Sequence, residues 1–284
     1  MGTENLKNLN GKFTPTRITR LHFLKLILRS LLFVAVFFIY LVDKSLLLDN
    51  IYHPGANPGA YFLVFIWIFF FVEMLLRFFP SDYESMGCQK QFSRNFVQND
   101  NFPKVTAAIK KKHLKSIVIV GTVWIAFNAI IGALFFIGII DEAILLIIAL
   151  FFAVCDVICI LFYCPFQSLM MKNRCCVTCR IYNWDFLMMF TPLIFIMSYY
   201  TLSLFAIALL LFIKWEITYF RHPEWYCEET NQNLSCAVCT EKLCLHKDSL
   251  RAPKREKAVN TSFDPFASLK DNKSSRAESH TEEK

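Results

Sequence analysis

Residues 143–163 read AILLIIALFFAVCDVICILFY, an almost unbroken apolar run that decides the fold class. A helix needs roughly 20 such residues to cross about 30 Å of hydrocarbon, and the stretches 23–42, 60–79 and 116–140 satisfy the same test. The whole chain is 55% hydrophobic with 30 Phe and a mean hydropathy of +0.41. This composition excludes a water-soluble globule. The sequence therefore predicts an all-α polytopic protein whose first partner is the lipid bilayer.

A fifth apolar stretch over 184–220 is too long for one span, because a single helix of this length would measure roughly 55 Å. Small polar and aromatic residues at 198–201 are typical of a membrane interface. We therefore expect a helical hairpin over 185–220, with a short first span kinked at Pro192. The preferred fold has six transmembrane helices arranged as three hairpins. The alternative is one steeply tilted helix, which gives five spans.

The distribution of positive charge orients the spans, because Lys and Arg are enriched in cytoplasmic segments. The segments 1–22, 80–115 and 164–184 and the tail from Lys214 hold nearly all of the 30 Lys and Arg, whereas the outer loops hold Lys44 alone. This asymmetry predicts six spans in the cytoplasmic membrane with both termini in the cytoplasm. Nucleic acid is not an expected partner, because the basic residues flank apolar segments.

The predicted organisation follows from these boundaries. The outer loop 43–59 is rich in turn-forming residues, the first span is expected to be retained rather than cleaved as a signal peptide, and a surface helix is expected over 104–115. The expected segments are a cytoplasmic N-terminal segment 1–22, four transmembrane helices within 23–163 with the cytoplasmic loop 80–115, a cytoplasmic Cys-rich loop 164–184, the hairpin 185–220, a Cys-rich metal-binding segment 221–247, and a disordered tail 248–284.

Eight of the eleven cysteines fall into two runs on the predicted cytoplasmic side. A reducing compartment disfavours disulfides there, so metal binding or thiol redox chemistry is expected. The spacing C-x2-C-x4-C-x-H in the second run is typical of a zinc site, and its four cysteines also suit an iron–sulfur cluster. The first run comprises Cys164, Cys175, Cys176 and Cys179, and the second comprises Cys227, Cys236, Cys239 and Cys244 together with His246.

The first run allows more than one chemistry. Cys176-x2-Cys179 has the reach of a metal-binding pair, and it also reads as a reactive dithiol whose pKa is lowered by the neighbouring Arg174 and Arg180. Because both runs leave the membrane on the same side, a joint metal site with ligands from both runs is a further alternative. The cofactor predicted from the two runs is zinc or an iron–sulfur cluster.

Two acidic residues inside the predicted spans, Glu73 and Asp156, are functional candidates, because charge in the bilayer is costly. Glu73 precedes Arg77 by four residues, a spacing that predicts an ion pair along the helix. Asp156 lies between Cys155 and Cys159, with Asn128 available on the preceding span. Asp156 is therefore the candidate for an ion or proton step.

No nucleotide-binding or metalloprotease motif is present, and no catalytic residue is assigned. The leading hypothesis is a membrane protein whose cytoplasmic, cysteine-ligated metal site takes part in electron transfer. One alternative is a zinc-stabilised module that docks a cytoplasmic protein partner without catalysis. Another is a transporter of a metal or other ion with Asp156 in its path.

Overall fold

The computed structural model describes residues 15–52, 58–99, 105–173, 175–236, 238–239 and 247. The chain divides into the units Met1–Lys247 and Asp248–Lys284, and every described residue belongs to the first. The tail predicted to be disordered therefore lies outside the described residues, as do the predicted ligands Cys244 and His246.

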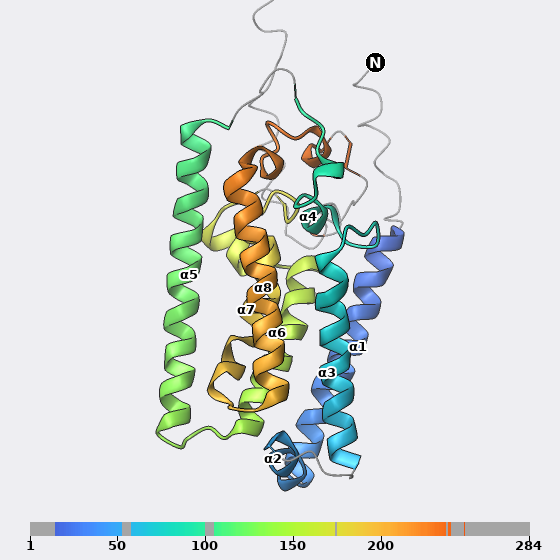
Figure 1. Ribbon diagram of the computed structural model, residues 1–284, viewed down its shortest axis with the longest axis vertical. Helices are drawn as coiled ribbons and strands as arrows, with labels where there is room; N and C mark the ends of the chain where they lie inside the picture. Colours follow the sequence, from blue (N-terminus) through green and yellow to red (C-terminus); the bar gives the residue numbers. More distant parts are fainter. Residues whose placement is uncertain are drawn as a thin grey trace, which may run out of the picture. The chain divides into compact units, whose positions relative to one another are not determined.

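Among the described residues, five helices are long and apolar enough to cross a membrane, one fewer than the six spans expected from the sequence. Large apolar side chains stay exposed on their outer faces; Phe136 is 77% exposed and Ile125 is 71% exposed. Such exposure would be unfavourable in water but suits contact with lipid. The five are α1 (Arg17–Val42), α3 (Pro58–Phe78), α5 (Ala107–Phe136), α6 (Glu142–Leu161) and α8 (Tyr199–Arg221) (Figure 1).

The described residues contain no strand, only an isolated bridge between Gln98 and Asn231. Within the same described ranges, nine short helical elements connect or cover the long helices. They are α2 (Ser45–Tyr52), α4 (Met86–Gln89), η1 (Ser93–Asn95), the π-helix η2 (Phe166–Met170), η3 (Tyr182–Trp184), α7 (Asp185–Phe190), η4 (Thr191–Phe195), η5 (Pro223–Tyr226) and η6 (Gln232–Leu234).

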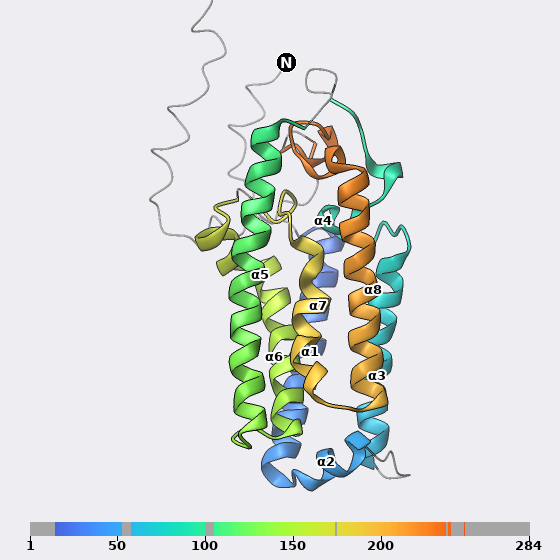
Figure 2. The same cartoon turned by 60° about the vertical axis from the view of Figure 1, so that its left-hand side comes forward.

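The first half of the predicted hairpin is a short, broken segment made of α7 and η4. It packs against both α6 and α8 and runs antiparallel to them (Figure 2). The change from α to 3-10 geometry begins one residue before Pro192, which has no N–H to donate to an α-helix. The chain is extended at Ile196 and Ser198, so the single tilted helix considered as an alternative is wrong.

Burial explains how so short a segment is accommodated. Phe186, Phe190 and Leu193 are almost completely enclosed by neighbouring helices. Lipid requires a long helix because every backbone group must be paired within it. A segment surrounded by protein is free of that requirement, so this pass through the bundle is shorter than the five lipid-facing helices.

Three other boundaries differ from the sequence-based expectations. The predicted surface helix 104–115 and the span 116–140 form one continuous helix, α5. This helix ends at Phe136, and the nearby Gly138 adopts a left-handed φ of 83°. The outer loop 43–59 contains α2 rather than turns alone. The first helix begins at Arg17, because the Thr16 hydroxyl caps it by accepting from the Thr19 N–H at 3.2 Å.

Residues 79–99, 162–184 and 222–236 gather at one end of the bundle, which we call the loop end (Figures 1 and 2). The Gln232 N–H donates to the Val97 carbonyl at 2.9 Å. The Lys90 ammonium donates to the carbonyls of Val177 and Cys179 at 2.8 and 2.7 Å. Both cysteine runs therefore reach the same end of the bundle through their described residues.

Candidate functional site

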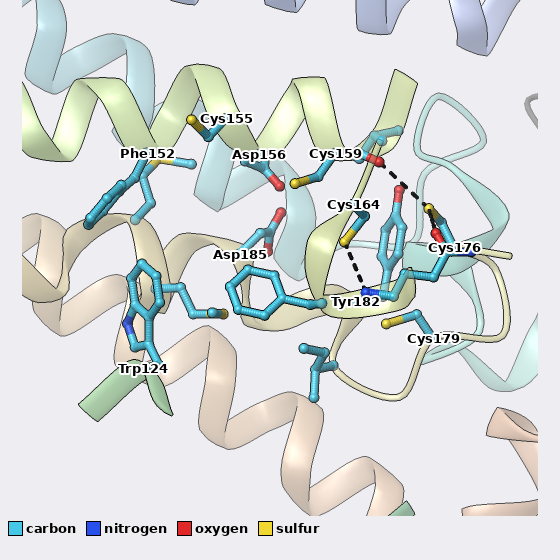
Figure 3. Close-up of a pocket in the computed structure, with 16 residues that line it drawn as sticks. Trp124, Phe152, Cys155, Asp156, Cys159, Cys164, Cys176, Cys179, Tyr182 and Asp185 are labelled. Atoms are coloured by element: carbon cyan, nitrogen blue, oxygen red, sulfur yellow. Dashed lines mark hydrogen bonds between the residues drawn. The ribbon is translucent and has the colours of Figure 1, made fainter. Parts of the chain in front are cut away.

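A cavity of about 140 Å³ opens at the loop end, where α6 stops and the chain turns back. Helix α6 ends at Leu161, shortly before Cys164 and Pro165. A residue before proline avoids the helical conformation, so the helix does not continue through Cys164. The chain then folds through η2 and returns to α7, and these elements form the walls (Figure 3). We call this space the thiol cavity after the cysteines that line it, which are Cys155, Cys159, Cys164, Cys176 and Cys179.

Cys159 and Cys164 both line the cavity, and the Cys159 side chain favours the ionised form of Cys164. This interaction is the largest cause that lowers the pKa of Cys164 to about 7. Burial acts in the opposite direction, and the Gln167 N–H, 3.4 Å from the Cys164 sulfur, helps to stabilise the thiolate. Near neutral pH, Cys164 is therefore a partly ionised nucleophile beside a thiol partner.

Cys176 occupies the wall of the cavity next to the Lys247 ammonium. Its thiol donates to the Gln167 side-chain oxygen at 3.2 Å. The Lys247 ammonium lies 2.8 Å from the Cys176 sulfur and donates to the Cys159 carbonyl at 2.7 Å. Burial nevertheless raises the pKa of Cys176. Lys247, which follows the second cysteine run in the sequence, thus contacts the first run at Cys176.

Cys179 and Cys227 are buried thiols of a different kind. Burial raises the pKa of each to about 12, although the nearby Lys90 ammonium opposes the change. Burial also lowers the pKa of Lys90 to about 8, so this cation is itself poorly solvated. The reactive dithiol predicted for Cys176-x2-Cys179 stays a prediction, although burial raises rather than lowers the pKa of both thiols.

The predicted metal ligands do not converge within the part of the chain that the structure describes. No group of three or more His, Cys, Asp or Glu there is able to hold a metal ion. The Cys227 thiol instead donates to the Pro223 carbonyl at 3.7 Å, and Cys236 is exposed. The zinc or iron–sulfur site stays a prediction, because Cys244 and His246 lie outside the described residues.

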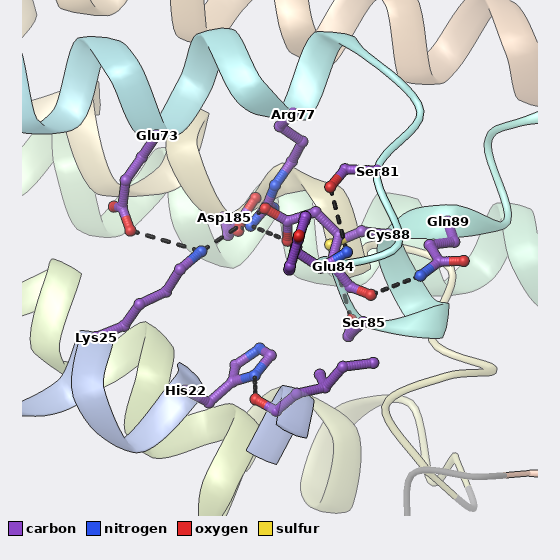
Figure 4. A network of polar contacts seen from close by, with 12 residues as sticks. His22, Lys25, Glu73, Arg77, Ser81, Glu84, Ser85, Cys88, Gln89 and Asp185 are labelled. Carbon is purple, nitrogen blue, oxygen red and sulfur yellow. Dashed lines mark hydrogen bonds and ion pairs between the residues drawn. The ribbon is translucent and has the colours of Figure 1, made fainter. Parts of the chain in front are cut away.

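A chain of alternating charges runs from the thiol cavity through the bundle. Arg29, midway along α1 and 1% exposed, donates to Asp156 at 2.8 Å and to Glu73 at 2.9 Å. Lys25 lies 3.5 Å from Glu73 and 3.7 Å from Glu84, and Arg77 lies 3.7 Å from Glu84 and 2.5 Å from Asp185 (Figure 4). We call this set the ion chain, in the order Asp156, Arg29, Glu73, Lys25, Glu84, Arg77 and Asp185.

The predicted pair between Glu73 and Arg77 is wrong, because each side chain turns to a different helix. Glu73 meets α1, and Arg77 meets Asp185 at the start of α7. An i, i+4 pair contributes only about 0.2–0.5 kcal/mol on a helix, which is less than a buried, charge-assisted pair. Tertiary contacts therefore decide the partners.

Sequence reasoning overlooked Lys25 and Arg29 as intramembrane charges. A signal existed, since His22, Lys25 and Arg29 recur at helical spacing within an otherwise apolar span. Asn128 does not contact Asp156; its amide donates to the Trp124 carbonyl of its own helix at 3.0 Å.

A second buried ion pair fastens the loop end to α8. Arg180 donates to Glu216 at 2.6 Å, and the Trp184 indole N–H donates to the same carboxylate at 2.8 Å. The Arg180 guanidinium also lies over the Tyr219 ring, 3.7 Å from its centroid. This pair is balanced, with one positive and one negative charge.

Comparison with known proteins identifies no relative of this chain. No family model matches the chain, and no curated protein or solved structure matches it significantly.

Proposed function

We propose that this multi-pass membrane protein is a thiol redox protein, in which Cys159 and Cys164 form the working dithiol and a lipid-soluble quinone is the electron acceptor. The observation that carries the proposal is the position of these two cysteines in the wall of one largely apolar cavity, where the Cys159 side chain lowers the pKa of Cys164. The pKa of Cys164, about 7, supports the same assignment, because thiolates are the reactive form of cysteine.

The reaction balances as a two-electron transfer. Both S–H bonds break, one S–S bond forms between Cys159 and Cys164, and the dithiol loses two electrons and two protons. The quinone gains these two electrons and two protons and leaves as the hydroquinone.

The size and lining of the cavity suit the ring of such an acceptor. An apolar cavity of about 150 Å³ is known to accommodate a single benzene ring, and the thiol cavity measures about 140 Å³. Trp124, Phe152 and Phe166 contribute aromatic faces to it, and stacking on aromatic side chains favours a flat ring.

We place the loop end, both termini and both cysteine runs in the cytoplasm. The support is the concentration of Lys and Arg in the segments that meet at this end. A reducing cytoplasm would keep the dithiol reduced, so electrons would pass from cytoplasmic thiols into the membrane. A membrane-impermeant maleimide tests this orientation at Cys236, which is exposed. Labelling should require permeabilised cells, and labelling of intact cells would contradict the placement.

Thiol counting with a short-chain quinone tests the redox assignment. Protein purified in detergent under reducing conditions should lose two titratable thiols after the quinone is added, and peptide mapping should find a Cys159–Cys164 disulfide. Cys159→Ser and Cys164→Ser should each abolish this loss. Cys88→Ser is the matched control, because burial raises the pKa of Cys88 and it lies outside the cavity. Equal oxidation of the wild type and Cys164→Ser would contradict the proposal.

The cysteine-ligated metal remains a separate proposal for the second run. Its support is the sequence spacing alone, and in that reading zinc orders a segment that docks a cytoplasmic protein partner. Metal analysis of protein purified anaerobically without an affinity tag should find about one zinc, or an iron–sulfur cluster, per chain. Cys239→Ser should remove the metal and leave the oxidation of Cys159 and Cys164 unchanged. A metal-free wild-type protein would contradict this proposal.

A further inference from the structure

The ion chain carries more negative than positive charge. Its four carboxylates are those of Asp156, Glu73, Glu84 and Asp185, and its three cations are Lys25, Arg29 and Arg77. No other Lys or Arg among the described residues forms an ion pair with these carboxylates. An uncompensated charge in a buried network is costly, and a bound proton removes that cost.

The two ends of the ion chain meet at the thiol cavity. Asp156 and Asp185 both line it, and Figure 3 shows their carboxyl groups pointing toward one another. Each is paired with a different cation, Asp156 with Arg29 and Asp185 with Arg77. Two facing carboxylates in a protein interior cannot both ionise without strong repulsion, so such a pair commonly shares one proton.

An unpaired oxygen marks the same place. The Asp185 side chain is 5% exposed, and its Oδ1 atom is buried without a hydrogen-bond partner. Because a buried acceptor without a donor is unfavourable, a proton on the facing carboxyl would supply the missing donor. The geometry therefore favours this pair over the carboxylates inside the chain, since Glu73 and Glu84 each have two cations nearby.

The competing proton site is His22 of α1. Its ring is buried and its Nδ1 donates to the Ile18 carbonyl at 2.8 Å, while the cations Lys25 and Arg77 oppose a further positive charge. The charged and titratable groups that act on the carboxyl pair from the surrounding elements are Arg29, Glu73, Arg77, Glu84, Cys88, Cys155 and Cys159.

We infer that Asp156 and Asp185 hold one shared proton at the thiol cavity and act as the proton carrier for chemistry in it. The shared proton is inferred from the ion chain alone, whereas the carrier role rests on the proposed redox function. When the dithiol is oxidised, the carboxyl pair relays the two protons of the breaking S–H bonds, one after the other, to the quinone as it takes up the two electrons. Its own protonation state is unchanged at the end of the reaction.

Infrared spectroscopy of the full chain in detergent tests the shared proton directly. A protonated carboxylic acid has a carbonyl stretch above the amide bands, and this band shifts when H₂O is exchanged for D₂O. The wild type should show such a band at neutral pH, and Asp156→Asn and Asp185→Asn should each lose it. Both variants should remain folded, because each leaves three carboxylates with three cations.

The controls separate this proton from other sources. His22→Gln and Cys164→Ser should keep the band. Absence of the band from the folded wild type, its survival in both aspartate variants, or its loss in His22→Gln would overturn the inference.

A second readout concerns the carrier role. Asp185→Asn should slow quinone-dependent disulfide formation at least tenfold while leaving alkylation of Cys164 by a neutral reagent unchanged. An unchanged oxidation rate would overturn the carrier role. Failure of the redox function itself is distinguishable, since in that case wild-type oxidation would not depend on Cys164 although the infrared band would still respond to Asp156 and Asp185.

Discussion

Two arginines, Arg29 and Arg180, are each 1% exposed, yet they differ in the charges around them. Arg180 belongs to a balanced pair with Glu216, whose carboxylate also accepts the Trp184 N–H. Arg29 belongs to the ion chain, which carries surplus negative charge. Both ends of the ion chain lie at the thiol cavity. The difference teaches that a buried charge is not by itself a functional signal. A balanced pair holds two elements together, whereas an unbalanced network leaves a proton to be exchanged.

The largest effect is expected from Arg29→Ala. This change leaves both Glu73 and Asp156 without their shared cation, and breaking a buried pair by removing one partner costs about 3–5 kcal/mol. We expect little folded protein, measured as thermal unfolding and monodisperse yield in detergent. Asp185→Asn is the matched removal of a carboxylate and should melt close to the wild type. Equal stability of Arg29→Ala and the wild type would show that the ion chain does not hold the bundle together.

A smaller effect is expected at the balanced pair. Arg180→Ala should lower the melting temperature, because Glu216 loses its cation, and it should increase maleimide labelling of Cys179 by loosening the loop end. Replacing both partners, as Arg180→Met with Glu216→Leu, should recover most of the stability, since apolar replacement of a whole buried pair is often neutral. If the double variant is no more stable than Arg180→Ala, the Arg180–Glu216 pair has a role beyond fastening.

The pH dependence of thiol alkylation sharpens the comparison at the cavity. Only the thiolate reacts, and the pKa is about 7 for Cys164 and about 12 for Cys179. Alkylation of Cys164 should therefore rise as pH increases through about 7 and then level off, whereas Cys179 should react roughly a hundredfold more slowly at neutral pH.

Substitution of Lys247 tests how much a single nearby positive charge contributes to the pH profile of Cys164 alkylation. Its ammonium is one of the causes that lower the pKa of Cys164. Lys247→Gln should shift the Cys164 profile to higher pH, and Lys247→Arg should not. If the pH profile of Cys164 alkylation in Lys247→Gln is identical to that of the wild type, this ammonium does not lower the pKa of Cys164.

The smallest effect is expected from an uncharged packing change, Gly132→Ala. A Cβ atom there would lie 2.5 Å from the Phe195 ring of η4, so α5 and the short segment must separate or the ring must move. Overpacking of this kind costs about 1–3 kcal/mol. Gly121→Ala is the control, because its nearest neighbour is 4.0 Å away. The melting temperature should fall only in Gly132→Ala, and loss of the infrared band in that variant would tie proton binding to packing rather than charge.

The length of the apolar runs was sufficient to predict the long helices from the sequence. The run 143–163 became α6 almost within its predicted limits, because twenty apolar residues leave no other way to satisfy the backbone in lipid. Pro192 correctly indicated a break in the segment 185–220. The short length of its first half was also predicted, but local sequence could not show that this segment would be covered by protein, which is what permits it to be short.

The candidate site was predicted only in outline. Asp156 and Cys164 were recognised individually, from a charge inside a span and from the cysteine runs. Their surroundings were not, since Arg29 lies 127 residues from Asp156 in the chain and donates to it at 2.8 Å. The expected partner of Glu73 was wrong for the same reason, because weak local pairing yields to stronger contacts between helices.

The sequence by itself determined that the protein is helical, membrane-embedded and rich in thiols, because composition and hydrophobic length act locally and need no knowledge of neighbours. Only the tertiary structure decided which cysteines line the cavity, which charges are paired, and where negative charge is in excess. Those properties depend on burial and on distances of a few ångströms between side chains of different helices, which set the cost of each charge. Cys159 and Cys164 share one cavity, and the carboxyl groups of Asp156 and Asp185 face each other there, only because α6 ends beside the start of α7.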